Sequence, residues 1–84
     1  MARLKLASLL LDEKNYDAAL SLLNAKHAEA YDGLYADLKG DVLLAQGKIE
    51  EARIAYKVAF DKTAEQDSYR NLIQMKLDAA GGAK

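Results

Sequence analysis

Two aspartates four residues apart, Asp37 and Asp41, are the strongest candidates for acid–base chemistry in this sequence. In a helix this spacing places both carboxylates on one face, one turn apart. Paired carboxylates act as general acid and general base where burial and proximity separate their pKa values. A polar stripe on a helical hairpin usually faces solvent, however, and we interpret the pair as ordinary surface charge.

No other set of residues suggests catalysis or metal binding. His27 is the only histidine, cysteine is absent, and the three serines, Ser8, Ser21 and Ser68, have no base nearby in sequence. A nucleophile needs a base and a group that orients the base, and zinc needs several nitrogen or sulfur ligands. We interpret His27 as a solvated loop residue and expect no enzyme activity, no cofactor and no bound metal.

The composition favours a small helical domain. Of 84 residues, 51% are hydrophobic and 30% are charged, the formal net charge is −1, and proline and tryptophan are absent. This balance is typical of a helix-rich globular chain and offers no basic surface for nucleic acid. No purely apolar run exceeds four residues, so none is long enough to insert into a membrane. The lack of cysteine leaves the compartment open.

Apolar residues recur at spacings of three and four in every segment, which predicts an all-α chain. We expect one domain over residues 1–80 and a disordered tail over 81–84. Its predicted parts are a hairpin over 2–25, a second hairpin over 29–63 whose first helix spans 29–46, and a capping helix over 67–79. Asn15 and Asp67 are predicted to cap the second and fifth helices through their side chains.

The two hairpins repeat one pattern. A shift of 33 residues places Ala7 on Gly40 and Ala19 on Ala52, so that small residues align with small ones. A helical hairpin that repeats at about this period is typical of an α-solenoid, in which successive hairpins stack.

The second hairpin resembles a tetratricopeptide repeat. Its small, large and turn residues stand at that motif's spacings: Gly40, Leu43, Gly47, Ala52, Tyr56 and Ala59. Several features depart from the pattern. Ala7 replaces the first glycine of the first hairpin, and the usual proline after the second helix is absent. Ala36 and Lys39 replace its tryptophan and leucine, and in the first hairpin Lys14 stands where the turn glycine would be.

Four of these residues are predicted to have structural roles. Gly40 lets its helix approach the next helix closely, opposite the equally small Ala52. Gly47 ends the same helix, because a residue with positive φ is easily accommodated there. Tyr56 supplies the large side chain of the hairpin core.

A narrower resemblance covers nearly the whole chain. The stretches "LYADLKGDVLLAQGK" and "LIQMKLD" are similar to the C-terminal part of the ancillary SecYEG translocon subunit family. The resemblance implies a non-enzymatic interaction domain on the periplasmic side of the bacterial inner membrane, anchored by a segment absent from this chain. It also implies two partners, the SecYEG translocon and a membrane-anchored periplasmic chaperone of the prolyl-isomerase type, which would handle newly translocated proteins. The alternative is a generic cytosolic tetratricopeptide adaptor.

The tetratricopeptide resemblance also implies a concave binding face, here called the concave groove. Its expected residues follow one stripe of the inner helices: Leu4, Ser8, Leu11, Leu34, Asp37, Asp41 and Leu44. This groove is partly apolar and mildly acidic, so it suits extended or basic-apolar segments rather than a partner's terminal carboxylate.

The two ends of the stack are expected to differ. Ala2, Leu6 and Leu9 form an extra apolar stripe on the first helix, here called the N-terminal edge. We expect this edge to pack on further repeats or on a second copy of the chain. The last helix is expected to cap the other end, with one polar and one apolar side. The expected outward residues are Arg70, Asn71, Gln74 and Lys76, and the expected inward residues are Leu72, Ile73 and Leu77.

Overall fold

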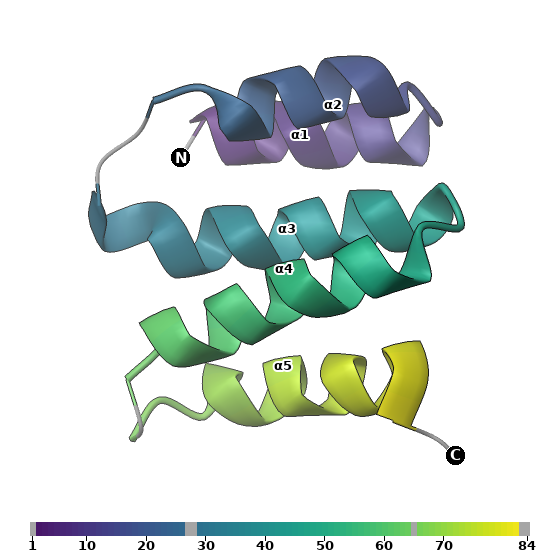
Figure 1. Ribbon diagram of the computed structural model, residues 1–84. Helices are drawn as coiled ribbons and strands as arrows, with labels where there is room; N and C mark the ends of the chain where they lie inside the picture. The colour runs from purple at the N-terminus through teal and green to yellow at the C-terminus, as the bar shows by residue number, and fades with distance from the viewer. Residues whose placement is uncertain (1, 27–28, 65, 83–84) are drawn as a thin grey trace.

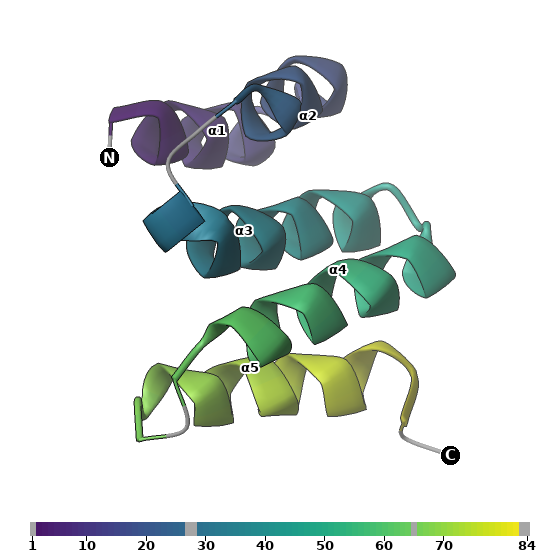
Figure 2. The ribbon, with the colours of Figure 1, turned by 60° about the vertical axis from the view of Figure 1, so that its left-hand side comes forward.

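The computed structural model describes residues 2–26, 29–64 and 66–82, and their regular structure is entirely helical. The elements are α1 (Ala2–Asp12), α2 (Tyr16–Asn24), a 3-10 turn η1 (Glu29–Tyr31), α3 (Asp32–Ala45), α4 (Ile49–Lys62), α5 (Tyr69–Leu77) and a π-helical turn η2 (Asp78–Gly82). The hairpin α1–α2 stacks on the hairpin α3–α4, and α5 follows (Figure 1). A second view shows the same order, with the termini at opposite ends (Figure 2). The predicted all-α, tetratricopeptide-like fold class is confirmed.

The turns of the two hairpins have the same geometry. Gly47 has φ +82°, and Lys14, 33 residues earlier, has φ +63°. The N–H of Lys48 donates to the carbonyl of Leu43 at 2.9 Å, and the N–H of Asn15 donates to the carbonyl of Leu10 at 2.8 Å. The sequence repeat is therefore also a repeat of backbone structure, and the positive φ expected at Gly47 is confirmed.

Several predicted helix ends differ from the structure. Asn15 is the N-cap of α2 but makes no side-chain capping hydrogen bond, so the predicted cap is wrong. Residues 29–31 form a 3-10 turn rather than the start of an α-helix. Asp67 does accept a hydrogen bond from the N–H of Tyr69 through its side chain, at 2.9 Å. Helical backbone also continues past residue 79, through η2, and His27 and residues 83–84 lie outside the described part of the chain.

The apolar core forms two clusters that share α3. One lies around the first hairpin and contains the buried residues Ala7, Ala19, Leu23, Tyr35 and Val42. The other lies around α4 and contains Leu43, Ala52, Ala55, Tyr56, Ala59, Ile73 and Ala80. The second cluster reaches α5 and η2, so both ends of the stack are tied to the central hairpin.

Gly40 makes the close approach expected of it, but to a different residue. A Cβ atom at this position would lie 2.4 Å from Cε1 of Tyr56, far inside the normal carbon–carbon contact distance of about 3.5–4.0 Å. The Tyr56 ring, and not Ala52, is therefore what requires a glycine here.

Candidate functional site

The aspartate pair lies under α5 rather than on a solvent-facing stripe. Asp37 is 6% exposed, and Nζ of Lys76 lies 3.0 and 3.2 Å from its two carboxylate oxygens. The same ammonium lies 3.3 Å from Oδ2 of Asp41. The interpretation of Asp37 as an exposed surface charge is therefore wrong, because Lys76 of α5 covers its carboxylate.

Two tyrosine hydroxyls complete this cluster. Tyr56 donates a hydrogen bond to Oδ1 of Asp41 at 2.6 Å, and Tyr69 donates one to Oδ2 of Asp37. Burial, reinforced by the neighbouring carboxylates, raises the pKa of both hydroxyls. Burial alone would lower the pKa of Lys76, but the two carboxylates outweigh it and the net pKa is raised.

In this cluster of five side chains, two carboxylates act as hydrogen-bond acceptors, and two hydroxyls and one ammonium act as donors. Each carboxylate accepts from one hydroxyl and from the ammonium, and these donors keep their protons at neutral pH. The cluster therefore fastens α5 to α3 and α4 and does not form an acid–base pair. Sequence reasoning missed Lys76, which is 39 residues from Asp37 along the chain and belongs to no motif with it.

The remaining residues of the predicted concave groove differ in exposure. Ser8 and Leu44 are exposed, whereas Leu4, Leu11, Leu34 and Asp41 are partly buried. Leu4 and Leu11 pack against the cluster of the first hairpin. The exposed part of this face is therefore smaller than expected, and its role in binding remains a prediction.

The N-terminal edge is exposed, as the sequence suggests. Leu6 is 46% exposed and Leu9 is 54% exposed, and Ala2 is exposed beside them. What packs on this edge remains a prediction.

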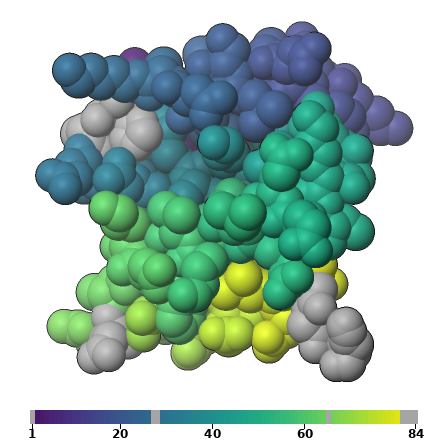
Figure 3. Space-filling view, viewed as in Figure 1, coloured from purple at the N-terminus to yellow at the C-terminus, as the bar shows by residue number. Residues whose placement is uncertain are grey.

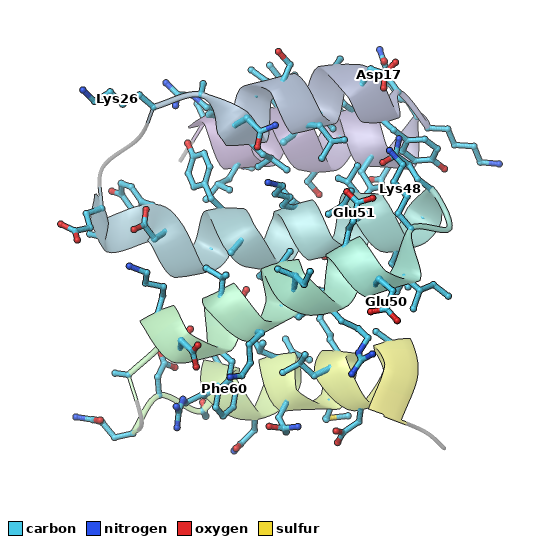
Figure 4. The ribbon with its side chains drawn as sticks, in the orientation of Figure 1. Asp17, Lys26, Lys48, Glu50, Glu51 and Phe60 are labelled. Atoms are coloured by element: carbon cyan, nitrogen blue, oxygen red, sulfur yellow. The ribbon has the colours of Figure 1, made fainter. Side chains whose placement is uncertain are left out.

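The outer side of α5 is only partly the polar cap that we expected: Asn71 and Gln74 are exposed, but other residues differ. Lys76 turns inward to the aspartates, while Leu72 is 45% exposed and Met75 is 65% exposed. Ile73 is fully buried, as expected. Arg70 is tied down: its guanidinium carbon lies 3.9 Å from the centre of the Phe60 ring and its Nε donates to the Phe60 carbonyl at 3.3 Å. Phe60 lies near the end of α4, beside the start of α5 (Figure 4).

A groove that sequence reasoning did not predict runs along α3 and α4 and reaches the end of α2, with α3 recessed as its floor (Figure 3). It consists of two hollows of about 330 and 280 Å³ that share Ala36, Lys39 and Val58. The larger hollow is completed by Leu43, Glu51, Ile54 and Ala55. The smaller is completed by Leu23, Asn24, Asp32, Tyr35 and Lys62. We call these two hollows the outer groove.

Within 2–26, 29–64 and 66–82, no three His, Asp or Glu side chains converge to hold a metal ion. Over the same residues, every helix is too short or too polar to cross a bilayer.

Comparison with known proteins agrees with this architecture. An ancillary SecYEG translocon subunit of Neisseria gonorrhoeae (strain ATCC 700825 / FA 1090) is 39% identical over 79 residues, which cover 94% of this chain and 38% of that protein. The ancillary SecYEG translocon subunit of Escherichia coli (strain K12) is 32% identical over 75 residues, covering 89% of this chain and 36% of that protein. The chain thus spans less than two fifths of the length of either relative.

No solved structure matches the chain. The family model described as a tetratricopeptide repeat-like domain matches residues 1–82. Helical hairpins of this kind stack into extended surfaces that bind other proteins, and the two relatives are named as subunits of a larger assembly. The resemblance seen in the sequence is confirmed: the chain belongs to the tetratricopeptide repeat-like domain family that it shares with ancillary SecYEG translocon subunits.

Proposed function

We propose that this chain is the interaction domain of an ancillary Sec translocon subunit on the periplasmic side of the bacterial inner membrane. There it helps to receive newly translocated proteins together with membrane-anchored chaperones of the prolyl-isomerase type. The observation that carries the proposal is 39% identity to a protein of that name across 94% of the chain.

The concave groove is the proposed surface for translocated chains. Ser8 and Leu44 are exposed on it, and Asp41 adds a carboxylate whose side chain is 29% exposed. Lys76 compensates one of the two aspartate charges, so the groove keeps about one negative charge. A partly apolar, weakly acidic surface suits weak binding of extended segments with apolar and basic residues.

Site-specific photocrosslinking in the complete protein, in its own membranes, tests this function. Crosslinkers replace Ser8 and Leu44, with a control at the exposed Asp17 on α2 (Figure 4). We expect Ser8 and Leu44 to capture translocon subunits or translocating chains, and Asp17 to capture neither. Crosslinks only to cytosolic proteins would overturn the proposal in favour of a cytosolic adaptor, and equal labelling from Asp17 would refute the role of the groove.

A further inference from the structure

The outer groove lies where the chain departs from the tetratricopeptide pattern. That pattern has tryptophan and leucine at the positions of Ala36 and Lys39, and these two residues line both hollows. A methyl group therefore replaces an indole, and a long flexible amine replaces a compact aliphatic side chain. Two large apolar groups that would occupy this space are missing, and the hollows follow from their absence.

The walls of the outer groove expose apolar surface that the described residues leave uncovered. Ile54 is 66% exposed and Val58 is 41% exposed, and both line the larger hollow above the buried Leu43 and Ala55. Contiguous apolar surface in a concave setting is typical of a binding site.

The positive charge of Lys39 makes the outer groove favour a ligand with negative charge. It is half-buried at the wall common to both hollows, and among the described residues it forms no hydrogen bond or ion pair. At one end of the groove Lys62 is compensated by Asp32, 3.6 Å away. At the other end Glu51 lines the larger hollow, whereas the neighbouring Glu50 points away from it (Figure 4), and Glu51 repels a ligand carboxylate placed there. Lys39, whose charge is not compensated in this way, lies between these two ends of the outer groove.

We propose that the outer groove binds an extended protein segment in which one acidic residue stands between two aliphatic residues. In an extended chain, residues i and i+2 point to the same side and residue i+1 to the other. The two aliphatic side chains enter the two hollows, and the acidic side chain faces the rim. The stem of Lys39 lies along the apolar wall and carries its ammonium to that rim.

An internal segment fits this surface better than a chain terminus. A terminal carboxylate placed at Lys39 would end the ligand at the common wall, and one of the two hollows would stay empty. The proposal adds a second surface and a ligand class to the proposed interaction function, and it rests on that function only in requiring a protein partner.

Peptides test the proposal on the 84-residue chain. The probe is a fluorescein-labelled, end-blocked Ser-Gly-Leu-Glu-Leu-Gly-Ser peptide, compared with versions that carry Gln or Lys in place of Glu. We expect the Glu peptide to bind best by fluorescence anisotropy, with about a two- to fivefold loss for the Gln peptide, typical of a partly exposed ion pair. Added salt should reduce this difference.

Matched variants locate the binding. Lys39→Glu should reverse the preference, so that the Lys peptide binds best, and Ile54→Ser should weaken the Glu peptide about tenfold through lost apolar contact. Ile54 is largely exposed, so this variant keeps its fold. Met75→Ser on α5 is the control and should change nothing, because Met75 is as exposed as Ile54, at 65%, and lines neither hollow.

Three results would overturn the proposal. The first is binding of the Glu peptide that is as tight to Lys39→Glu as to the parent chain, and the second is unchanged binding to Ile54→Ser. The third is concentration dependence of the amide NMR shifts of Lys39 and Val58 without peptide, which would make a second copy of the chain the occupant. None of these results depends on crosslinking from Ser8 and Leu44, so the two proposals fail separately.

Discussion

Replacing Gly40 with alanine should destabilise the fold, although alanine is the better helix former. A glycine-to-alanine change inside a helix ordinarily stabilises by about 0.5–1 kcal/mol. Here the new Cβ atom would lie 2.4 Å from Cε1 and 2.5 Å from Cδ1 of Tyr56. Normal carbon contacts begin at about 3.5 Å, so the overlap is about 1 Å.

The Tyr56 ring cannot move away at low cost. It is 1% exposed, and its hydroxyl is held by Asp41 at 2.6 Å. Overpacking of a tight core costs about 1–3 kcal/mol, and loss of the hydrogen bond adds about 1 kcal/mol. After the gain in helix propensity is subtracted from these two costs, we expect the free energy of unfolding to fall by about 2 kcal/mol. This corresponds to about 8–16 °C in Tm for a domain of this size.

Urea unfolding followed by circular dichroism measures this change, and Gly33→Ala is the matched control in the same helix. A Cβ atom on Gly33 would meet Oγ1 of Thr63 at 3.3 Å and Cβ of Lys62 at 3.6 Å. These contacts need only a small adjustment, so its stability should change by less than about 1 kcal/mol.

The reasoning about Gly40 is refuted if Gly40→Ala is as stable as the parent or more stable. It also requires that the penalty of Gly40→Ala largely disappear in a Tyr56→Leu background, since the clash is with the ring. A double-mutant cycle measures this coupling directly.

Four further predictions follow from the same structure. Lys76→Met should lower the free energy of unfolding by about 2–3 kcal/mol, because it leaves a buried carboxylate without its cation; a loss below about 0.5 kcal/mol in urea unfolding would contradict this. The contribution of this cluster to the free energy of unfolding should be complete below pH 10.0, the ordinary pKa of tyrosine, and should decrease as pH rises above that value. The raised pKa values of Tyr56, Tyr69 and Lys76 mean that the folded state holds more protons than the unfolded state in that range, and phenolate absorbance should show two tyrosines that ionise only on unfolding. Lys14→Gly should raise stability by about 0.5–1 kcal/mol, because it relieves a left-handed backbone conformation, so it and Gly40→Leu should shift Tm in opposite directions. Light scattering over a concentration series should show self-association that Leu9→Ser removes, and a parent chain that stays monomeric throughout would contradict a role for the N-terminal edge in pairing.

The fold was predictable because its signals repeat. Spacings of three and four indicate helices in every segment, and the 33-residue shift aligns Lys14 with Gly47, two positions that share a left-handed conformation. Helix ends were less predictable. Asn15 is a favourable cap residue, but its side chain makes no capping bond, because capping depends on local backbone geometry that residue type alone does not determine.

The surfaces were predictable only in part, because they depend on pairs far apart in sequence. Asp37 and Asp41 have the spacing of a surface stripe, and only the position of α5 brings Lys76 over them. The sequence did show that Ala36 and Lys39 depart from the repeat pattern. That these departures leave open hollows required knowledge of how α4 packs beside both hollows and α2 beside the smaller one.

The division of the core between Val42 and Leu43 has a consequence for unfolding. These neighbours belong to different clusters, Val42 to that of the first hairpin and Leu43 to that around α4. Loss of either cluster would expose one side of α3 while its other side stays packed. We therefore expect α3 to be the last helix to unfold. Its amide protons should exchange with solvent only through global unfolding, while those of α1 and α5, each bound to a single cluster, exchange through smaller openings. The two small cores are thus coupled through α3 and through Leu20 of α2, which packs against both.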